Sequence, residues 1–326
     1  MKAVVQERFG PPDVLRLAEI DRPEVAPGEV LVLVRAAALN PYEWHMLRGD
    51  PKIARLIPGA VGLTRPRSPV AGLDAAGVVE AVGADVRDLQ VGDEVFGFCP
   101  GALAEYASAK AGALVHKPAS LTFEHAAALP IAATTALRGV SEVGKVQDGH
   151  RVLINGAAGG VGHFAVQIAA GLGAEVTGVC GPGGTELVRS LGASRVINYT
   201  TADFTRERGR YDVIFDNVGN RPLRQLRHAL APAGTLVLNG GGAPGTVIGP
   251  IGTMFGAAAV NGLVRQHLRF VPTRQDQAEL TALAGLVDDG KLTAVIDRTY
   301  SLADTAAGLR YVEAGHVHGK VVITVA

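Results

Sequence analysis

The sequence predicts an α/β protein with a mostly β domain first and a domain built on a doubly wound parallel sheet after it. A length of 326 residues suits two domains at roughly 150 residues each. Residues 1–124 are rich in β-branched runs and turn signals, whereas short apolar strands alternate with helical segments from about residue 125. This alternation is typical of βαβ units, whose parallel sheet is buried on both faces.

Composition limits the partners and the location of the protein. Lysine plus arginine total 31 and aspartate plus glutamate total 31, so no excess positive charge favours a nucleic acid or an anionic membrane. The longest apolar run, residues 251–264, is shorter than the roughly 20 residues of a membrane span. Residues 1–8 lack the apolar core of a signal peptide. We therefore expect a cytoplasmic protein without nucleic-acid or membrane partners.

The first part of the chain is expected to be a compact β domain without a long helix. Residues 1–8 resemble a strand, and a second strand over 29–35 follows the turn signal Pro27-Gly28. Further strands are predicted over 75–82 and 92–98, separated by Gly83 and a polar stretch. Residues 53–69 contain prolines and glycines among scattered arginines, which predicts a loop or a short helix on the surface.

The second part begins with an alanine-rich helical stretch over 124–143, interrupted by Pro130. Strands are then predicted over 151–155, 175–180, 195–198, 211–215 and 235–239, with helices over 161–172, 185–191 and 223–230 between them. The end of the chain is predicted to form a helix over 277–288, a strand over 295–300, a helix over 302–314 and a strand over 320–325.

A glycine-rich turn joins the strand 151–155 to an apolar helix. In the pattern Ala157-x-Gly159-x-x-Gly162, Gly159 lets the backbone approach a pyrophosphate, and Gly162 lets the helix pack closely on the strand. The helix N-terminus adds free N–H groups and a positive dipole. An ordinary tight turn is the alternative, but the strand-turn-helix context favours a dinucleotide site. The residues predicted to hold the dinucleotide here are Ala158, Gly159, Gly160 and Val161.

The end of the next strand predicts which dinucleotide binds. NAD-dependent proteins carry an acidic residue there, which accepts a hydrogen bond from the adenine ribose 2′-OH. In this sequence the strand ends at Cys180-Gly181, with no aspartate or glutamate. A 2′-phosphate would meet no repulsion, so NADPH is expected in preference to NADH. Gly181, Arg189 and Tyr199 are the nearest candidates to contact that phosphate.

Together these motifs resemble the medium-chain dehydrogenase/reductase superfamily, in particular its zinc-free quinone oxidoreductase-like branch. The resemblance covers nearly the whole chain and rests on residues 27–34, 38–41, 74–83, 91–97, 101–106, 129–136, 157–162 and 318–322. It implies a GroES-like β-barrel catalytic domain over 1–124, a Rossmann domain over 125–267 and a returning catalytic-domain segment over 268–326. It also implies a cleft between the domains and a homodimer.

The resemblance further implies that no zinc is bound. Zinc-dependent relatives hold a catalytic zinc with a Cys, a His and a second Cys, and this sequence has Asn40, Leu73 and Ile131 at the matching places. Leucine and isoleucine have no donor atom, and Asn40 alone cannot hold the metal. The two cysteines of the chain are too few for a four-cysteine structural site. Without a Lewis acid, alcohol oxidation is disfavoured.

The implied chemistry is hydride transfer from NADPH to a quinone or an α,β-unsaturated carbonyl. Hydrogen-bond donors would stabilise the negative oxygen in place of zinc. The candidates are Asn40, Tyr42 and His45, with Tyr42 preferred as donor, although each also has an ordinary structural interpretation. Two alternatives stay open: an enoyl reductase of a biosynthetic pathway, and a dinucleotide-binding protein with little turnover.

The remaining cofactor contacts follow from the resemblance and from strand ends. The resemblance places Thr135 beside the nicotinamide, and it leaves open whether Lys320 lies near the cofactor or at the sheet edge. Ligands bind at the carboxyl ends of parallel strands. This places five further residues near the nicotinamide half: Asn217, Val218, Gly219, Gly240 and Gly241. The apolar segment 251–264 is expected to be a lid over the cleft or a subunit contact.

Overall fold

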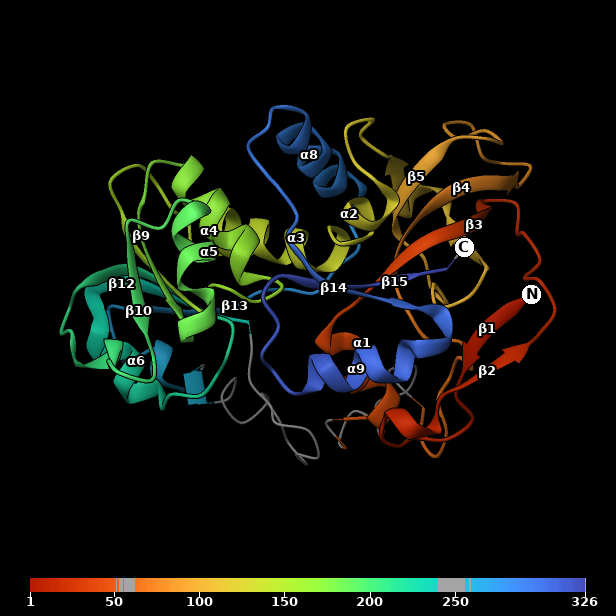
Figure 1. The fold of residues 1–326 in the computed structure, drawn as a ribbon. Coiled ribbons are helices and arrows are strands. Elements are labelled where there is room, and N and C mark those ends of the chain that lie inside the picture. Colours follow the sequence, from red (N-terminus) through yellow and green to blue (C-terminus); the bar gives the residue numbers. More distant parts are fainter. Residues whose placement is uncertain (51, 53–54, 56–61, 240–255, 258, 326) are drawn as a thin grey trace.

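The computed structural model describes residues 1–50, 52, 55, 62–239, 256–257 and 259–325. These residues form two lobes, each built around its own sheet (Figure 1). The predicted cofactor contacts Gly240 and Gly241, and most of the apolar segment 251–264, lie outside the described residues. No described helix is long and apolar enough to cross a membrane.

The sheet of the second lobe has six parallel strands in the order β10-β9-β8-β11-β12-β13. The strands are β8 (Arg151–Asn155), β9 (Glu175–Cys180), β10 (Arg195–Asn198), β11 (Tyr211–Asp216), β12 (Leu230–Leu238) and β13 (His267–Phe270). Strands β8, β9 and β10 follow one another toward one edge of the sheet, and strands β11, β12 and β13 follow one another toward the other edge. The order therefore reverses between β8 and β11, which is where dinucleotides bind to such sheets.

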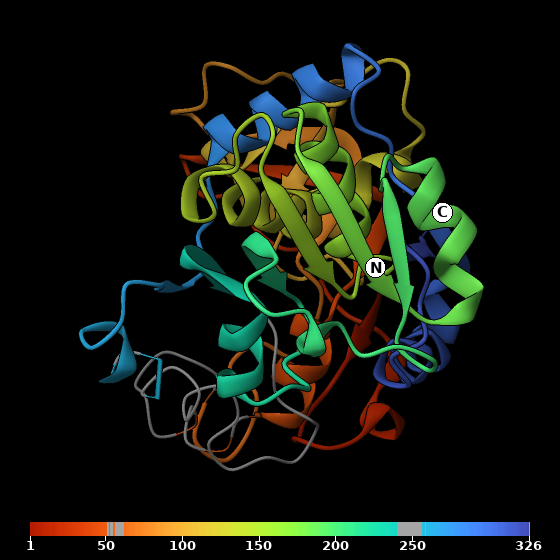
Figure 2. The ribbon, with the colours of Figure 1, turned by 90° about the vertical axis from the view of Figure 1, so that its left-hand side faces the viewer.

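Alternate residues of these strands face two separate hydrophobic layers. Val152 packs in the layer that contains Phe164 of α4 (Gly162–Gly171), whereas the next residue, Leu153, packs in the layer that contains Leu226 of α6 (Leu223–Ala229). Helix α5 (Thr185–Ser190) contributes Val188 to the first layer. Figure 2 shows the strands of this lobe from the outside. The sheet is therefore covered by helices on both faces, as the continuous apolar strands predict.

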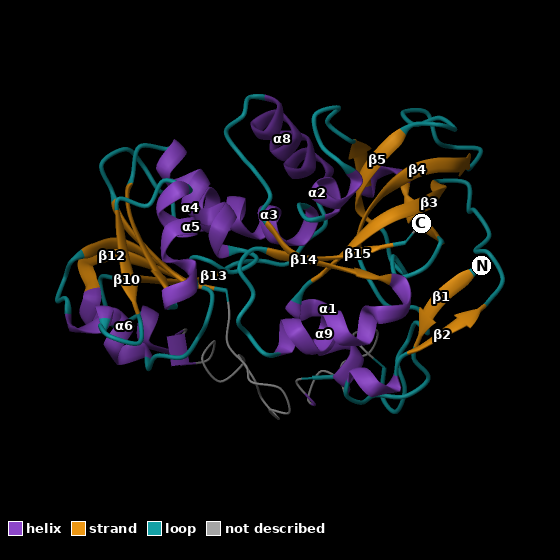
Figure 3. Cartoon of the chain, in the orientation of Figure 1, coloured by secondary structure: helices purple, strands orange, loops and turns teal. Residues whose placement is uncertain are grey.

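The sheet of the first lobe uses both ends of the chain. Its order is β14-β15-β3-β4-β5-β7, with β6 paired to β3, and a separate pair is formed by β1 and β2. These strands are β1 (Lys2–Val5), β2 (Arg16–Glu19), β3 (Glu29–Leu39), β4 (Asp74–Val82), β5 (Glu94–Phe98), β6 (Tyr106–Lys110), β7 (Leu114–His116), β14 (Ile296–Ser301) and β15 (Lys320–Thr324). β15 pairs antiparallel with β3, and Val321 lies opposite Leu39. The C-terminal segment thus returns to the first lobe (Figure 3).

The remaining helices lie between the two lobes and, in the view of Figure 1, above and below β14 and β15. They are α1 (Pro41–Arg48), α2 (Phe123–Ala127), α3 (Pro130–Leu137), α8 (Gln277–Asp288) and α9 (Thr305–Glu313), and a π-helical turn over Arg138–Val143 continues α3. Helices α1 and α9 lie side by side below β14 and β15 (Figure 1). Helix α3 contacts α4 of the second lobe and β4 and β5 of the first, so it connects the two lobes.

The elements that were not predicted include strands β2 and β7, helix α1 and strand β13. Helix α1 begins directly after Asn40, where the sequence analysis places no helix; the side chain of Glu43 accepts the Asn40 N–H, and Gly49 ends the helix at φ 60°. Strand β13 crosses the predicted boundary at residue 267, and only Leu268 of its four residues is buried. The boundaries at residues 124 and 267 themselves stay predictions.

Candidate functional site

The glycine-rich turn after β8 has the backbone geometry that its spacing predicts. Gly156 adopts φ 77°, a left-handed conformation that favours glycine. A Cβ at Gly162 would lie 2.0 Å from the Gly156 carbonyl oxygen, so only glycine allows the first turn of α4 to approach β8 this closely. Ala157 takes the place of the first glycine and is fully buried.

The outer part of the turn is open. A Cβ at Gly159 would meet only the Gly156 carbonyl oxygen, at 3.4 Å, and one at Gly160 would meet Gly319 and Lys320 at 3.5 Å. Ala158 and Val161 flank these glycines directly before α4. The space beside the turn and the adjacent helix N-terminus fit the pyrophosphate of a dinucleotide, which would be held by the backbone of residues 158–161.

The turn that follows β9 carries no acidic side chain between residues 181 and 185. The Tyr199 hydroxyl oxygen lies 3.1 Å from the position that a Cβ of Gly181 would take, and the imidazole of His318 packs over Gly183, 2.9 Å from its Cβ position. Arg189 lies further along, on the exposed side of α5. Gly181, Tyr199 and His318 thus lie close together at the end of β9, where the adenosine half of a dinucleotide binds to such a sheet. His318 was missed as a candidate because it follows Gly183 by 135 positions in the chain.

Polar residues meet where β8 and β11 end side by side. The Asp216 Oδ1 atom accepts hydrogen bonds from Asn155 Nδ2 at 2.8 Å and from the backbone N–H groups of Val218 and Gly219 at 3.1 Å each. Asn217 donates to the Asn155 carbonyl at 3.3 Å. The predicted residues 217–219 are thus held at the point of reversal in strand order.

Asp216 and Asn155 were not singled out from the sequence. Asp216 is fully buried, and its Oδ2 atom has no hydrogen-bond partner among the described residues. The sequence could have indicated both residues, because each is polar and each ends an apolar strand of the same parallel sheet. An unpaired buried carboxylate oxygen at this edge fits a bound ligand that donates a hydrogen bond.

A second polar cluster lies in the first lobe and is completely buried. Asn40 Nδ2 donates to Asp74 Oδ2 at 3.0 Å, and the Lys320 ammonium donates to Asn40 Oδ1. The Lys320 nitrogen also lies 3.7 Å from Asp74 Oδ2, and Asp74 Oδ1 accepts the Ile131 N–H at 3.1 Å. All three side chains are at most 3% exposed. Glu43 belongs to the same cluster, because its side chain accepts a hydrogen bond from the Asn40 N–H. We call these four residues, Asn40, Glu43, Asp74 and Lys320, the buried polar cluster.

Burial changes the charge states in this cluster. Burial, together with repulsion from Asp74, raises the pKa of Glu43 to about 8, against the stabilising hydrogen bond from the Asn40 N–H at 2.6 Å. Burial raises the pKa of Asp74 to about 6, although Lys320 and Asn40 oppose this shift, and burial lowers the pKa of Lys320. At pH 7 Glu43 is therefore mostly protonated, beside Asp74 and the Lys320 nitrogen that lies 3.7 Å from it.

The other two candidate donors lie on helix α1. Tyr42 is 37% exposed, which makes it more accessible to a substrate than Asn40, at 3%. Its pKa is raised, first by burial and then by Glu43 and Asp74, so its hydroxyl is protonated at neutral pH. His45 stacks on Trp44 with ring centroids 3.7 Å apart, and burial lowers its pKa. Tyr42 thus keeps a proton that it can donate, and His45 is neutral.

The structure brings several predicted residues together and separates others. Lys320 lies beside Gly160 of the phosphate-binding turn and contacts Asn40, so it joins the cofactor and donor candidates. Thr135 lies half-buried on α3. The positions matched to zinc ligands gather around Asp74, which Asn40 and Ile131 contact directly and Leu73 precedes. Among the described residues, no group of three His, Cys, Asp or Glu side chains is placed to hold a metal ion.

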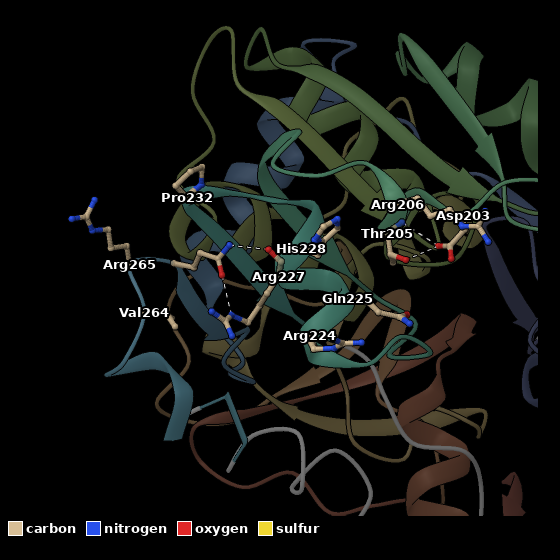
Figure 4. Close-up of a pocket in the computed structure, with 11 residues that line it drawn as sticks. Asp203, Thr205, Arg206, Arg224, Gln225, Arg227, His228, Pro232, Val264 and Arg265 are labelled. Carbon is tan, nitrogen blue, oxygen red and sulfur yellow. Dashed lines mark hydrogen bonds between the residues drawn. The ribbon is translucent and has the colours of Figure 1, made fainter.

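A hollow of about 900 Å³ lies away from this site, on the second lobe beside α6 (Figure 4). Its lining is rich in arginine, and Arg227 there is hydrogen-bonded to Gln266 at 2.9 Å. None of the predicted cofactor or donor residues lines it, so it is separate from the candidate site.

Comparisons with known proteins agree with this architecture. Residues 26–119 match the family model described as "Alcohol dehydrogenase GroES-like domain", and residues 191–323 match the one described as "Zinc-binding dehydrogenase". The chain is 35% identical to "NAD(P)H oxidoreductase RTN4IP1, mitochondrial" of Mus musculus, covering 100% of this chain and 89% of that protein. It is 32% identical to "NADPH-dependent alkenal/one oxidoreductase, chloroplastic" of Arabidopsis thaliana, over 99% of this chain and 79% of that protein.

The chain also resembles a solved structure in its three-dimensional fold. The quinone oxidoreductase from Coxiella burnetii superposes with a TM-score of 0.86 at 30% identity, over 100% of this chain and 99% of that one. The fold has the GroES-like domain and the parallel-sheet Rossmann domain that the sequence analysis predicted. The chain therefore belongs to the medium-chain dehydrogenase/reductase superfamily, in its quinone oxidoreductase-like branch, and is an oxidoreductase.

Proposed function

We propose that this oxidoreductase transfers hydride from NADPH to a quinone or an α,β-unsaturated carbonyl without a catalytic metal. The observation that carries the proposal is the contact between the two lobes at the start of β15. There the Gly319 N–H donates to the Ala158 carbonyl at 2.8 Å, and Lys320 donates to Asn40. The phosphate-binding turn and the candidate donors are thus linked through two consecutive residues.

The nicotinamide, when bound, supplies the hydride. The chain's own residues position the acceptor and stabilise the negative charge that develops on its oxygen. Tyr42 is protonated at neutral pH and is the most accessible of the three candidate donors, so it is proposed to donate to this oxygen. For a quinone the proton goes to oxygen; for an enone, water or Tyr42 protonates the enolate carbon.

The choice of NADPH over NADH rests on the turn after β9. The absence of an acid at residues 181–185 leaves a 2′-phosphate without repulsion, and the Tyr199 hydroxyl lies beside Gly181. The 32% identical relative named above is NADPH-dependent by its name, which supports the same choice.

The test is NADPH consumption with a small quinone, a free enone and a carrier-bound enoyl chain, before and after EDTA treatment. We expect quinone or free-enone turnover that EDTA leaves unchanged. Activity lost in EDTA and restored by zinc would contradict a metal-free reaction. Turnover confined to the carrier-bound chain would favour the enoyl reductase alternative, and tight NADPH binding without consumption would indicate a binding protein.

Tyr42→Phe tests the proposed donor separately. Removing the hydroxyl should lower kcat by about 100-fold, the usual effect of losing a positioned acid. Tyr106→Phe is the matched control, because Tyr106 lies on β6 against Arg22 and away from α1. If Tyr42→Phe and the control turned over equally fast, a group other than Tyr42 would have to be the proton donor.

We also propose a homodimer in the cytoplasm. Strand β13 forms an edge of the six-stranded sheet and pairs only with β12 among the described residues, which leaves its other side open to a second copy. Sedimentation at micromolar concentration would show a mass near 67 kDa for a dimer, roughly twice the chain's 33.7 kDa.

A further inference from the structure

We propose that Lys320 is a positioning residue, which locks the orientation of the Asn40 amide and sets its place relative to the phosphate-binding turn. This inference rests on the proposed function, because it concerns a donor candidate of that reaction. It goes beyond that function by assigning a role to a buried lysine that contacts the Asn40 amide from the returning segment.

The hydrogen bonds around Asn40 allow only one orientation of its amide. Lys320 donates to Oδ1, and Nδ2 donates to Asp74 Oδ2 at 3.0 Å. A flipped amide would turn its NH2 group towards the ammonium and its carbonyl oxygen towards the carboxylate, so that both contacts become repulsive. The ion pair of Lys320 and Asp74 therefore acts on both ends of one side chain.

The locked orientation leaves one N–H of Asn40 available. Among the described residues, the second Nδ2 hydrogen has only the Ala38 carbonyl as a partner, at 3.5 Å, the limit of a hydrogen bond. That N–H is the part of Asn40 that can donate to the oxygen of an acceptor. Without Lys320 the amide loses the partner of its oxygen, and the direction of this N–H is no longer determined.

The lysine is itself held by the nucleotide-binding lobe. The Gly319 N–H donates to the Ala158 carbonyl at 2.8 Å, and the Lys320 Cδ atom lies 3.5 Å from the Cβ position of Gly160. The Lys320 N–H donates to the Val295 carbonyl at 2.8 Å, and the Val295 N–H donates to His163 Nε2 at 3.2 Å in the first turn of α4. The backbone that carries Lys320 is thus attached directly to the phosphate-binding turn and, through Val295, to the first turn of α4.

The cluster also reaches helix α3. The remaining Asp74 oxygen accepts the Ile131 N–H, and Thr135 follows one turn later on the same helix. One ion pair therefore connects the returning segment, the first lobe and the helix that contacts α4. A shift of any of these parts would move the Asn40 amide.

The experiment compares Lys320→Met, Lys320→Arg and Asn40→Ser with the wild type. Methionine keeps the length and apolar contacts of the lysine stem but removes its donor, whereas arginine keeps a cation that can donate to Oδ1. Serine removes the amide and keeps a residue favoured directly before a helix. Arg138→Met is the control for the loss of a buried cation, since Arg138 pairs with Glu279 and the carbonyls of Pro272 and Arg274 outside this cluster.

The first readout is the ¹H–¹⁵N signal of the Asn40 side-chain amide, assigned by its disappearance in Asn40→Ser. We expect Lys320→Met to shift this signal and to speed its exchange with water, while Lys320→Arg and the Arg138→Met control keep it in place. An Asn40 signal in Lys320→Met identical to that of the wild type would overturn the proposal.

The second readout is turnover at saturating NADPH. Lys320→Met should lower kcat about tenfold or more, with less than about a threefold change in NADPH affinity, and Lys320→Arg should recover part of the loss. The double variant with Asn40→Ser should be no slower than the slower single variant, because the lysine acts through the amide. Wild-type kcat in Lys320→Met, or losses that multiply in the double variant, would refute a positioning role. If the wild type turns over no acceptor, the proposed function fails and the amide signal alone decides.

Discussion

Replacing Glu43 by glutamine should change how stability depends on pH. Glu43 is 1% exposed, and burial with repulsion from Asp74 raises its pKa from its ordinary value of 4.5 to about 8. Between these values the folded chain holds a proton that the unfolded chain has released. The free energy of unfolding therefore falls as pH rises, by up to about 1.4 kcal/mol per pH unit from this group. Integrated from pH 5.5 to 7.5, the loss is on the order of 2–3 kcal/mol.

Glutamine resembles the protonated acid and keeps an oxygen for the Asn40 N–H, but it does not titrate. Urea unfolding of the wild type and Glu43→Gln at pH 5.5, 6.5 and 7.5 measures the difference directly, so that the other groups of the cluster cancel to first order. From pH 5.5 to 7.5, the free energy of unfolding of Glu43→Gln should fall less than that of the wild type, by on the order of 2–3 kcal/mol. Glu80→Gln, at an exposed position of β4, is the matched control and should follow the wild type. Parallel curves for the wild type and Glu43→Gln would refute the reasoning.

Two further substitutions test the nucleotide-binding lobe. Gly162→Ala places a Cβ 2.0 Å from the Gly156 carbonyl oxygen, so NADPH affinity measured by fluorescence titration should fall at least about tenfold. Gly171→Ala in the same helix meets no atom within 4 Å and should bind normally; equal affinities for both variants would contradict a pyrophosphate site at this turn. Asp216→Ala removes the acceptor of one side-chain and two backbone donors, so urea unfolding should show a loss of about 1–3 kcal/mol. A change below about 0.5 kcal/mol would mean that those donors find other partners.

Much of the fold follows from local periodicity. The predicted ranges 151–155 and 277–288 coincide with β8 and α8, because a continuous apolar strand and an amphipathic helix of 12 residues each give a clear pattern. Helix α1 was missed because its eight residues bury only Glu43, Trp44 and Leu47, too few for a period. Strand β13 was missed because an edge strand of four residues with one buried side chain has no apolar run.

The candidate site was predictable in its parts and not in its assembly. The turn, Asn40 and Lys320 each lie in a recognisable motif, but Asn40 and Lys320 are 280 residues apart and meet only because β15 pairs with β3. Asp74 accepts hydrogen bonds from Asn40 and Ile131, partners that its position in the sequence did not indicate. Its charge became relevant only when tertiary structure placed Lys320 beside it.

The charge balance of the cluster leads to a last prediction, on the rate rather than on stability. At pH 7 Glu43 is mostly protonated, so an acceptor oxygen beside Asn40 faces a neutral carboxyl group at this position. Raising the pH through about 8 ionises Glu43 and adds a negative charge next to the place where negative charge develops. We therefore expect kcat to fall above pH 8 in the wild type and to stay level there in Glu43→Gln. An identical decline in both would show that a different group titrates, and that the cluster acts on the acceptor through geometry alone.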